Sequence, residues 1–83
     1  MNTKILFFSA PWCGPCKQMK KRLTESIKNE LSIEIIDISE NVTKSCEYQV
    51  MNVPTFIKIV DGKEVSRKVG SVTIDSLRGM LND

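Results

Sequence analysis

Four consecutive apolar residues near the start of the chain constrain its fold most. Residues 5–8 read Ile-Leu-Phe-Phe, without a polar residue between them. A strand with one face in water alternates apolar and polar side chains, whereas an unbroken apolar run is typical of a strand covered on both faces. The pattern therefore predicts a central strand over residues 4–8, in a sheet with helices on its faces.

A helical pattern and a second strand follow this central strand. After a turn over residues 9–13, apolar residues at helical spacing from Cys16 to Ile27 predict one helix that begins near Pro15 and ends near Asn29. Residues 33–38 are rich in isoleucine and predict a second strand. Together these segments form a strand–helix–strand unit, whose right-handed crossover makes its two strands parallel.

The second half of the chain predicts a short helix, a hairpin and a last helix. Ser39 or Asn41 is suited to cap the short helix, which reaches about Gln49. Residues 56–60 and 63–69 predict two antiparallel strands, joined by Asp61-Gly62, a pair that favours a two-residue turn. Weak alternation in the last strand indicates a sheet edge, and Thr73 is suited to cap the final helix.

The order of elements is thus strand, helix, strand, helix, strand, strand, helix. We therefore expect a single α/β domain over residues 1–83, with a four-stranded mixed sheet flanked by three helices. The 83 residues are 41% hydrophobic and 27% charged, which is ordinary for a globular domain.

Composition and charge argue against a membrane or a nucleic acid as the binding partner. The first apolar run, residues 5–8, is far shorter than the roughly 18 residues of a membrane span and the roughly 7–15 of a secretory signal. We therefore expect a cytoplasmic protein without a membrane partner. A net charge of +2 with 6% aromatic residues does not favour nucleic-acid binding. We also expect a monomer.

The three cysteines point to redox chemistry. Cys13 and Cys16 form a Cys-Gly-Pro-Cys segment where the first helix begins. Thiol–disulfide exchange needs a thiolate that attacks and a second thiol close enough to resolve the mixed disulfide. Unpaired amides at a helix N-terminus lower the pKa of the Cys13 thiol, while Cys16 lies one turn deeper on the apolar stripe. This spacing predicts Cys13 as the nucleophile and Cys16 as the resolving cysteine.

Half of a zinc site is the alternative for the same pair. Structural zinc requires four ligands, but the chain has no histidine and only one further cysteine, Cys46. We therefore expect no metal. Cys46 shares a helical stripe with Val42 and Val50, which predicts a small buried residue, and the alternative is a regulatory thiol.

Three segments resemble the thioredoxin family. Residues 12–17 read Trp-Cys-Gly-Pro-Cys-Lys directly after the apolar strand, as in the thioredoxin active site. Residues 53–55, Val-Pro-Thr, are similar to that family's cis-proline loop, and Lys68-Val69-Gly70 is similar to the segment bordering its substrate groove. Compared with full-length thioredoxins, we expect the leading strand and helix to be absent.

The resemblance assigns roles to the remaining site residues. Trp12, Gly14 and Pro15 complete the active-site loop, with Trp12 either an apolar docking surface or a packing residue. Val53, Pro54 and Gly70 bind substrate, with strand addition to the Val53 backbone. Without the family match, Pro54 is equally consistent with an ordinary proline at the start of a strand.

The resemblance also implies a thioredoxin-like fold and a protein disulfide oxidoreductase. Its substrates are disulfide-containing proteins, and it binds no cofactor, because the Cys13–Cys16 pair carries the electrons. An NADPH-dependent thioredoxin reductase is the implied partner. The alternatives are a glutathione-dependent glutaredoxin-like reductase and a binding subunit that never cycles. The chain lacks the Pro-Tyr pair between cysteines and the Gly-Gly-plus-acid segment that are typical of glutaredoxins.

Two positions depart from the family pattern. The aspartate that thioredoxins commonly bury under the second cysteine corresponds to Phe7, and its lysine partner falls near Ile35. An apolar wall raises the pKa of the Cys16 thiol by desolvation. We therefore predict slow resolution of mixed disulfides at low pH.

A basic run follows the two cysteines. It comprises Lys17, Lys20, Lys21 and Arg22. Such a run is typical of a solvated helix face, and its alternative role is to favour acidic partners.

Overall fold

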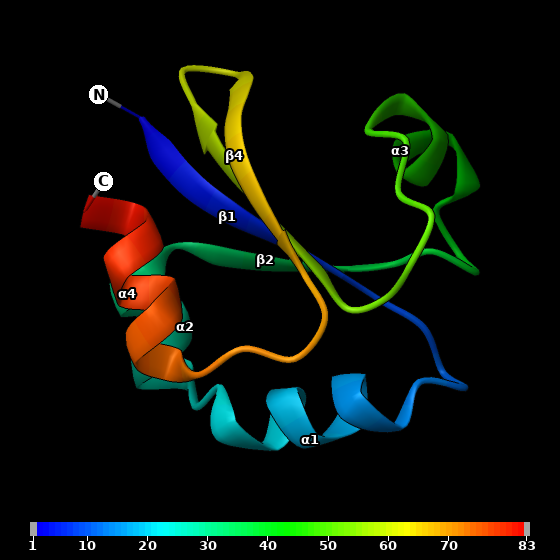
Figure 1. Cartoon of the computed structure of the whole chain (residues 1–83), viewed down its shortest axis with the longest axis horizontal. Helices are drawn as coiled ribbons and strands as arrows, with labels where there is room; N and C mark the ends of the chain where they lie inside the picture. The colour runs from blue at the N-terminus through cyan, green and yellow to red at the C-terminus, as the bar shows by residue number, and fades with distance from the viewer. Residues whose placement is uncertain (1, 83) are drawn as a thin grey trace.

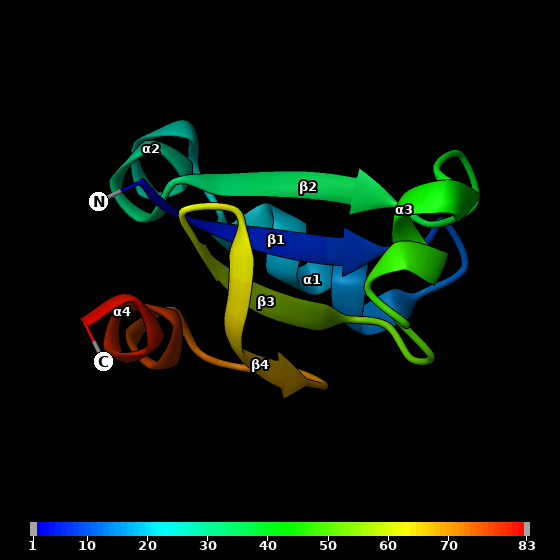
Figure 2. The same cartoon turned by 90° about the horizontal axis from the view of Figure 1, so that it is seen from above.

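The computed structural model describes residues 2–82, which form a four-stranded sheet between helices (Figures 1 and 2). In chain order the elements are β1 (Thr3–Ser9), α1 (Gly14–Arg22), α2 (Glu25–Leu31), β2 (Ile33–Asp37), α3 (Val42–Glu47), β3 (Thr55–Val60), β4 (Lys63–Val69) and α4 (Ile74–Asn82).

The sheet has the predicted mixed topology. Its strand order is β2-β1-β3-β4, with β1 parallel to β2 and antiparallel to β3, and with β3 antiparallel to β4. Phe7, in the middle of β1, lies opposite Ile35 on one side and Phe56 on the other. The fold class and the central position of the first strand are thus confirmed.

Both faces of β1 are covered, as the unbroken apolar run predicts. Ile5 and Phe7 pack against residues of α1, α2 and α4, whereas Leu6 and Phe8 belong to a second cluster on the opposite face. Tyr48 and Val50, which directly follow α3, pack against that second cluster. Figure 1 accordingly shows α1, α2 and α4 on one side of the sheet and α3 on the other.

The prediction of one long first helix is wrong. Leu23 leaves the helical conformation with ψ 82°, and Thr24 starts a separate helix by accepting a hydrogen bond from the Ile27 N–H at 3.3 Å. A threonine in extended conformation satisfies one of the free amides of a new helix, which favours the break. Residues 2–82 therefore contain four helices rather than the three expected.

The prediction of a buried stripe on the short helix is also wrong. Asn41 caps α3, since its side chain accepts the Lys44 N–H at 3.3 Å, but no residue of α3 is buried. Val42 is 60% exposed, and Cys46 is an exposed free cysteine. The apolar contacts on this side come from Tyr48 and Val50, beyond the helix end.

The hairpin and the last helix agree with the sequence. Asp61 and Gly62 both have positive φ, 50° and 84°, as the predicted tight turn requires. All residues of β4 are exposed, in keeping with an edge strand. The Thr73 hydroxyl accepts the Ser76 N–H at 3.0 Å, which makes Thr73 the predicted cap of α4.

Candidate active site

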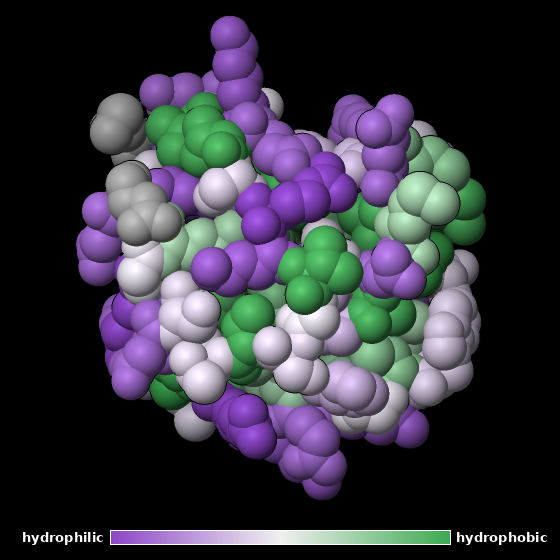
Figure 3. All heavy atoms as spheres, viewed as in Figure 1, coloured by the Kyte–Doolittle hydropathy of each residue, from purple (hydrophilic) through white to green (hydrophobic). Residues whose placement is uncertain are grey.

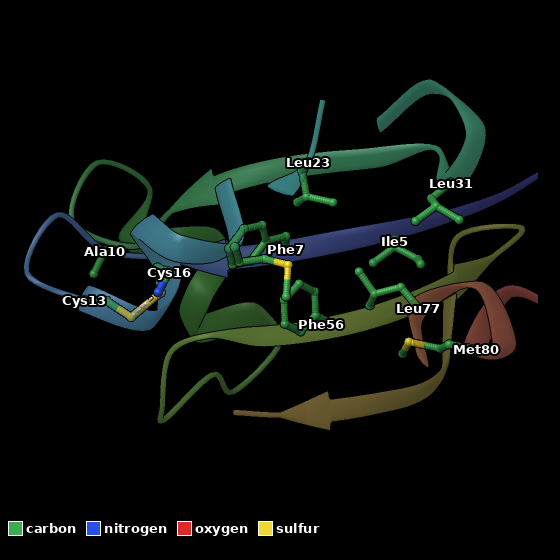
Figure 4. Packing of buried hydrophobic residues seen from close by; sticks show 11 residues of the cluster. Ile5, Phe7, Ala10, Cys13, Cys16, Leu23, Leu31, Phe56, Leu77 and Met80 are labelled. Carbon is green, nitrogen blue, oxygen red and sulfur yellow. Dashed lines mark hydrogen bonds between the residues drawn. A yellow bond between two sulfur atoms is a disulfide. The ribbon is translucent and has the colours of Figure 1, made fainter. Parts of the chain in front are cut away.

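Cys13 lies at the junction of the central strand and the first helix. After β1 ends at Ser9, a short loop closes through a hydrogen bond from the Cys13 N–H to the Ala10 carbonyl at 3.1 Å. Cys13 is the N-cap of α1, and its Sγ accepts the Cys16 N–H at 3.1 Å (Figure 4). A proline in the first turn has no amide to leave unpaired, so Pro15 suits its place. The local sequence thus aims a helix amide at this sulfur.

Cys13 and Cys16 form a disulfide, with their Cα atoms 5.2 Å apart. Cys16 is fully buried, whereas Cys13 retains 6% of its surface and lines a groove. An incoming molecule can therefore reach Cys13 but not Cys16. This asymmetry is what a nucleophile and a shielded resolving thiol require.

A groove of about 440 Å³ opens beside Cys13. Its walls come from the active-site loop, from the segment after β2 and from the loop before β3. The lining residues are Trp12, Cys13, Gly14, Pro15, Ile38, Met51, Asn52 and Val53. Trp12 and Met51 are 69% and 89% exposed, so two large apolar side chains flank the groove.

The predicted cis-proline loop forms one wall. The Val53–Pro54 peptide bond is cis, and Pro54 itself is buried, next in sequence to the lining residue Val53. Within residues 2–82, the N–H and C=O of Val53 have no hydrogen-bond partner. An extended segment of another protein could therefore pair with them.

Gly70 occupies a different place from the groove walls. Its N–H donates to the Pro54 carbonyl at 2.8 Å, and it has a φ of 96°, which glycine adopts readily. The structure thus brings Trp12, Gly14, Pro15 and Val53 together around Cys13. Gly70 is not among the lining residues, and its hydrogen bond connects it to Pro54.

Sequence reasoning missed three lining residues. Ile38, Met51 and Asn52 come from two loops far from the cysteines in the sequence. The position of Met51 and Asn52 directly before Val-Pro is an available signal, because the resemblance places that loop at the active site. Nothing in the sequence singled out Ile38, whose place follows from the pairing of β2 with β1.

The surroundings of the buried sulfur are apolar. Cys16 belongs to the cluster that contains Phe7 and Phe56, and Ile35 packs against the same cluster. Where the family commonly has an aspartate and a lysine, this chain therefore has Phe7 and Ile35, which form a hydrophobic wall beside Cys16. Ser9, the next residue of β1 after Phe8, is buried as well, and its hydroxyl has no hydrogen-bond partner within residues 2–82.

One carboxylate near the groove has a perturbed pKa. The Ser39 hydroxyl and N–H donate to Asp37 Oδ1 at 2.6 and 2.8 Å and lower the pKa of Asp37. These bonds join the residues on either side of Ile38, which lines the groove. Asp37 thus holds the turn that contains Ile38.

The site defines a class of protein. A disulfide at a helix N-terminus, with one sulfur facing a peptide-sized groove and the other buried, is built for thiol–disulfide exchange. No cluster of three or more metal-ligating side chains exists within residues 2–82. The fold and the site together describe a dithiol oxidoreductase on an α/β sheet.

Comparison with known proteins identifies the family. Residues 2–83 match the thioredoxin family. The chain is 36% identical over 78 residues to the thioredoxin of Bacillus subtilis, covering 90% of this chain and 75% of that one. It is 40% identical over 81 residues to the thioredoxin of Chlamydia caviae, with 94% and 78% covered. The chain belongs to the thioredoxin family.

Solved structures agree with this assignment. The structure of Fasciola hepatica thioredoxin superposes with a TM-score of 0.84 at 31% identity, covering 98% of this chain and 79% of that chain. A thioredoxin from Halobacterium salinarum gives a TM-score of 0.81 at 32% identity, with 96% and 72% covered. The protein is thus a thiol–disulfide oxidoreductase that acts on disulfide-containing proteins, and its redox-active group is the Cys13–Cys16 disulfide. No helix within residues 2–82 is long and apolar enough to cross a bilayer.

Proposed function

We propose that the chain works in the reducing direction, with Cys13 as nucleophile and Cys16 as resolving thiol. The roles of the two cysteines are supported by the hydrogen bond from the Cys16 N–H to Cys13 Sγ at 3.1 Å and by the full burial of Cys16. The reducing direction is supported by the Gly-Pro pair between the cysteines, which resembles that of the reducing members of the family. An amide donor and the positive end of a helix stabilise a thiolate at Cys13.

The cycle follows from this arrangement. In the reduced protein, the Cys13 thiolate attacks one sulfur of a target disulfide, and the other target sulfur leaves as a thiolate. Cys16 then loses its proton and attacks Cys13 Sγ, which releases the second target thiolate and forms the Cys13–Cys16 disulfide. Two electrons pass to the target, and the two released thiolates take up protons.

We propose that Val53 and the two apolar side chains hold the target. The free N–H and C=O of Val53 suit an extended segment, and Trp12 and Met51 supply apolar contact on either side of the sulfur. Pro54 and Gly70 keep this wall in place through their 2.8 Å hydrogen bond.

We further propose that an NADPH-dependent thioredoxin reductase regenerates the dithiol, and that the protein works in the cytoplasm. The free thiol of Cys46 is exposed, and such a thiol persists in a reducing compartment. Glutathione is the competing reductant.

Insulin reduction tests the proposal. We expect turnover with NADPH and thioredoxin reductase, and little with glutathione and glutathione reductase. Cys13→Ser abolishes turnover, and Cys16→Ser traps a covalent mixed disulfide with insulin. Cys46→Ser is the matched control, since it removes an exposed thiol elsewhere, and it keeps full turnover. Turnover with glutathione alone would instead indicate a glutaredoxin-like reductase, and unchanged turnover in Cys13→Ser would remove Cys13 as the nucleophile.

A further inference from the structure

Three lysines form one flank of α1, next to the redox-active cysteines. Lys17, Lys20 and Lys21 are spaced three and four residues apart, so their side chains emerge on the same side of the helix. All three are exposed, and Figure 3 shows hydrophilic side chains projecting along the edge of the molecule where Figure 1 places α1. This lysine flank begins one turn after Cys13, whose carbonyl accepts the Lys17 N–H at 3.2 Å.

The charge of the lysine flank is not neutralised by the chain itself. Within residues 2–82, none of its ammonium groups lies within 4.0 Å of a carboxylate oxygen, and α1 contains no acidic residue. Lys20 acts on Asp37 only at longer range, and that carboxylate is already hydrogen-bonded by Ser39. Cations that form ion pairs within residues 2–82 lie outside α1, among them Lys4, Lys28, Lys44, Arg67 and Arg78.

Helix stability explains only part of this pattern. Lys20 and Lys21 lie in the last turn of α1, where positive charge is favourable to the helix dipole. Lys17 lies near the start of the helix, where positive charge is unfavourable, and it repels Lys21 four residues further on. The flank is therefore a concentrated, uncompensated charge beside the nucleophile.

We propose that the lysine flank selects target proteins with acidic side chains about three to four residues from the disulfide to be reduced. The inference rests on the proposed reduction of target proteins. Lys20 and Lys21 follow Cys13 by seven and eight residues in the sequence, which corresponds to about 10–12 Å along a helix. An extended target segment spans that distance in about three to four residues.

The physical basis is electrostatic steering combined with a short apolar groove. Uncompensated charge of one sign raises the encounter rate with a partner of opposite sign by about tenfold or more at low salt. At about 0.1 M salt the Debye length is about 10 Å, so acidic groups close to the flank gain most. The groove beside Trp12 and Met51 supplies contact without charge discrimination.

Stopped-flow kinetics with designed peptides test the proposal. Each peptide carries one intramolecular disulfide and two Glu, two Gln or two Lys residues at the third and fourth positions outside it. Trp12, the single tryptophan and a neighbour of Cys13, reports oxidation of the dithiol protein by fluorescence. We expect the rate constant to decrease from Glu to Gln to Lys, with about a tenfold range at 20 mM salt. Equal rates at low salt overturn the proposal.

Charge-reversal variants locate the effect. Lys21→Glu and Lys20→Glu are expected to reduce the Glu-to-Lys rate ratio to near one, whereas Lys63→Glu, with the same change in net charge, is expected to keep it. Lys63 follows the hairpin turn, which lies at the opposite end of the molecule from α1 in Figure 1. Lys17 is left in place, because its N–H bonds the carbonyl of Cys13 and a change there could disturb the active-site loop. An equal loss in all three variants indicates an effect of net charge and overturns the assignment to the flank.

The outcomes also separate this inference from the proposed function. A protein that reduces no peptide and no insulin refutes the reduction activity itself. A protein that reduces all peptides equally, at low and high salt, refutes only the role of the lysine flank. If peptide preference is absent while Lys21→Glu abolishes binding to duplex DNA or to phosphatidylserine vesicles, the flank serves a polyanion, and the proposal is wrong.

Discussion

The rings of Phe7 and Phe56 stack across strands β1 and β3, with centroids 4.6 Å apart and planes inclined by 23°. This pair occupies the sheet face against which Cys16 packs (Figure 4). The position that commonly carries a buried aspartate in the family thus carries one half of an aromatic stack. The resolving thiol consequently has hydrophobic neighbours in place of a carboxylate.

This wall predicts a steep pH dependence of the resolution step. Because the Phe7 and Phe56 rings solvate a charged sulfur poorly, we expect the reactive Cys16 thiolate to be scarce at low pH. With a mixed disulfide preformed on Cys13, we expect the release rate to fall by about tenfold per pH unit in the acidic range, because only the thiolate attacks. Stopped-flow release of a fluorescent thiol between pH 5 and 9 measures it, with Cys16→Ser as the blank. A rate that is flat below pH 7 contradicts the prediction.

Removing the buried hydroxyl of Ser9 should stabilise the protein. Its oxygen is fully buried without a partner in the described part of the chain, and such a group costs about 1–3 kcal/mol. We expect Ser9→Ala to raise the free energy of unfolding by about 1 kcal/mol in urea titrations. Ser66→Ala, the same change on the exposed strand β4, serves as the control and should give no gain. A loss of stability in Ser9→Ala would reveal a bond that the hydroxyl makes.

The break between α1 and α2 should depend on Thr24. Its hydroxyl accepts the Ile27 N–H, so Thr24→Ala leaves that amide without its cap. We expect a loss of about 0.5–2 kcal/mol in the free energy of unfolding. Thr43→Ala is the matched control, because Thr43 is an exposed residue inside α3, where alanine is the better helix former. Equal effects of the two changes would argue against a cap.

Several features could be predicted from the sequence because they depend on local patterns. The unbroken run at residues 5–8 gave the central strand, Asp61-Gly62 gave the hairpin turn, and the Cys-Gly-Pro-Cys spacing gave the disulfide at a helix start. The helix break could not be predicted from periodicity, since Leu23 and Ile27 keep the same apolar spacing across it. The break lies in the non-helical backbone of Leu23 and in the cap that Thr24 forms.

Other features depend on tertiary arrangement. The orientation of α3, six residues long, is set by the segments that enter and leave it, so the spacing of Val42 and Cys46 alone did not predict which face is exposed. Ile38 follows β2 and Met51 precedes β3. Both line the groove beside Cys13 because β2 and β3 lie on either side of β1 in the sheet. Groove residues that come from distant segments need the sheet topology before they can be recognised.

An ion pair between helices should make stability pH-dependent. Arg78 Nε and Nη2 donate to the two Glu30 oxygens at 2.7 and 3.2 Å, joining α4 to α2. The hydrogen bond from Arg78 lowers the pKa of Glu30 below 4.5, so its stabilising effect is present above the unfolded pKa and is lost as pH falls through the folded one. The melting temperature of the native protein should exceed that of Glu30→Gln at pH 7, and the two should converge near pH 3. Glu40→Gln, without an ion pair in the described residues, should show no such convergence.

Arg67 should hold the groove wall in position. Its guanidinium donates to both Glu64 oxygens at 2.6 and 2.7 Å and to the Tyr48 carbonyl at 2.8 Å, which ties strand β4 to the start of the loop that carries Met51 and Val53. We expect Arg67→Ala to raise KM for a disulfide peptide by about three- to tenfold, in line with the loss of one or two net hydrogen bonds, while kcat stays within about twofold. Arg67→Lys should restore little, because an ammonium cannot bridge both acceptors. Lys63→Ala, a change to alanine on the same strand, should leave KM unchanged. A parallel fall of kcat in Arg67→Ala would show that the residue affects the chemistry at the sulfurs rather than the position of the loop.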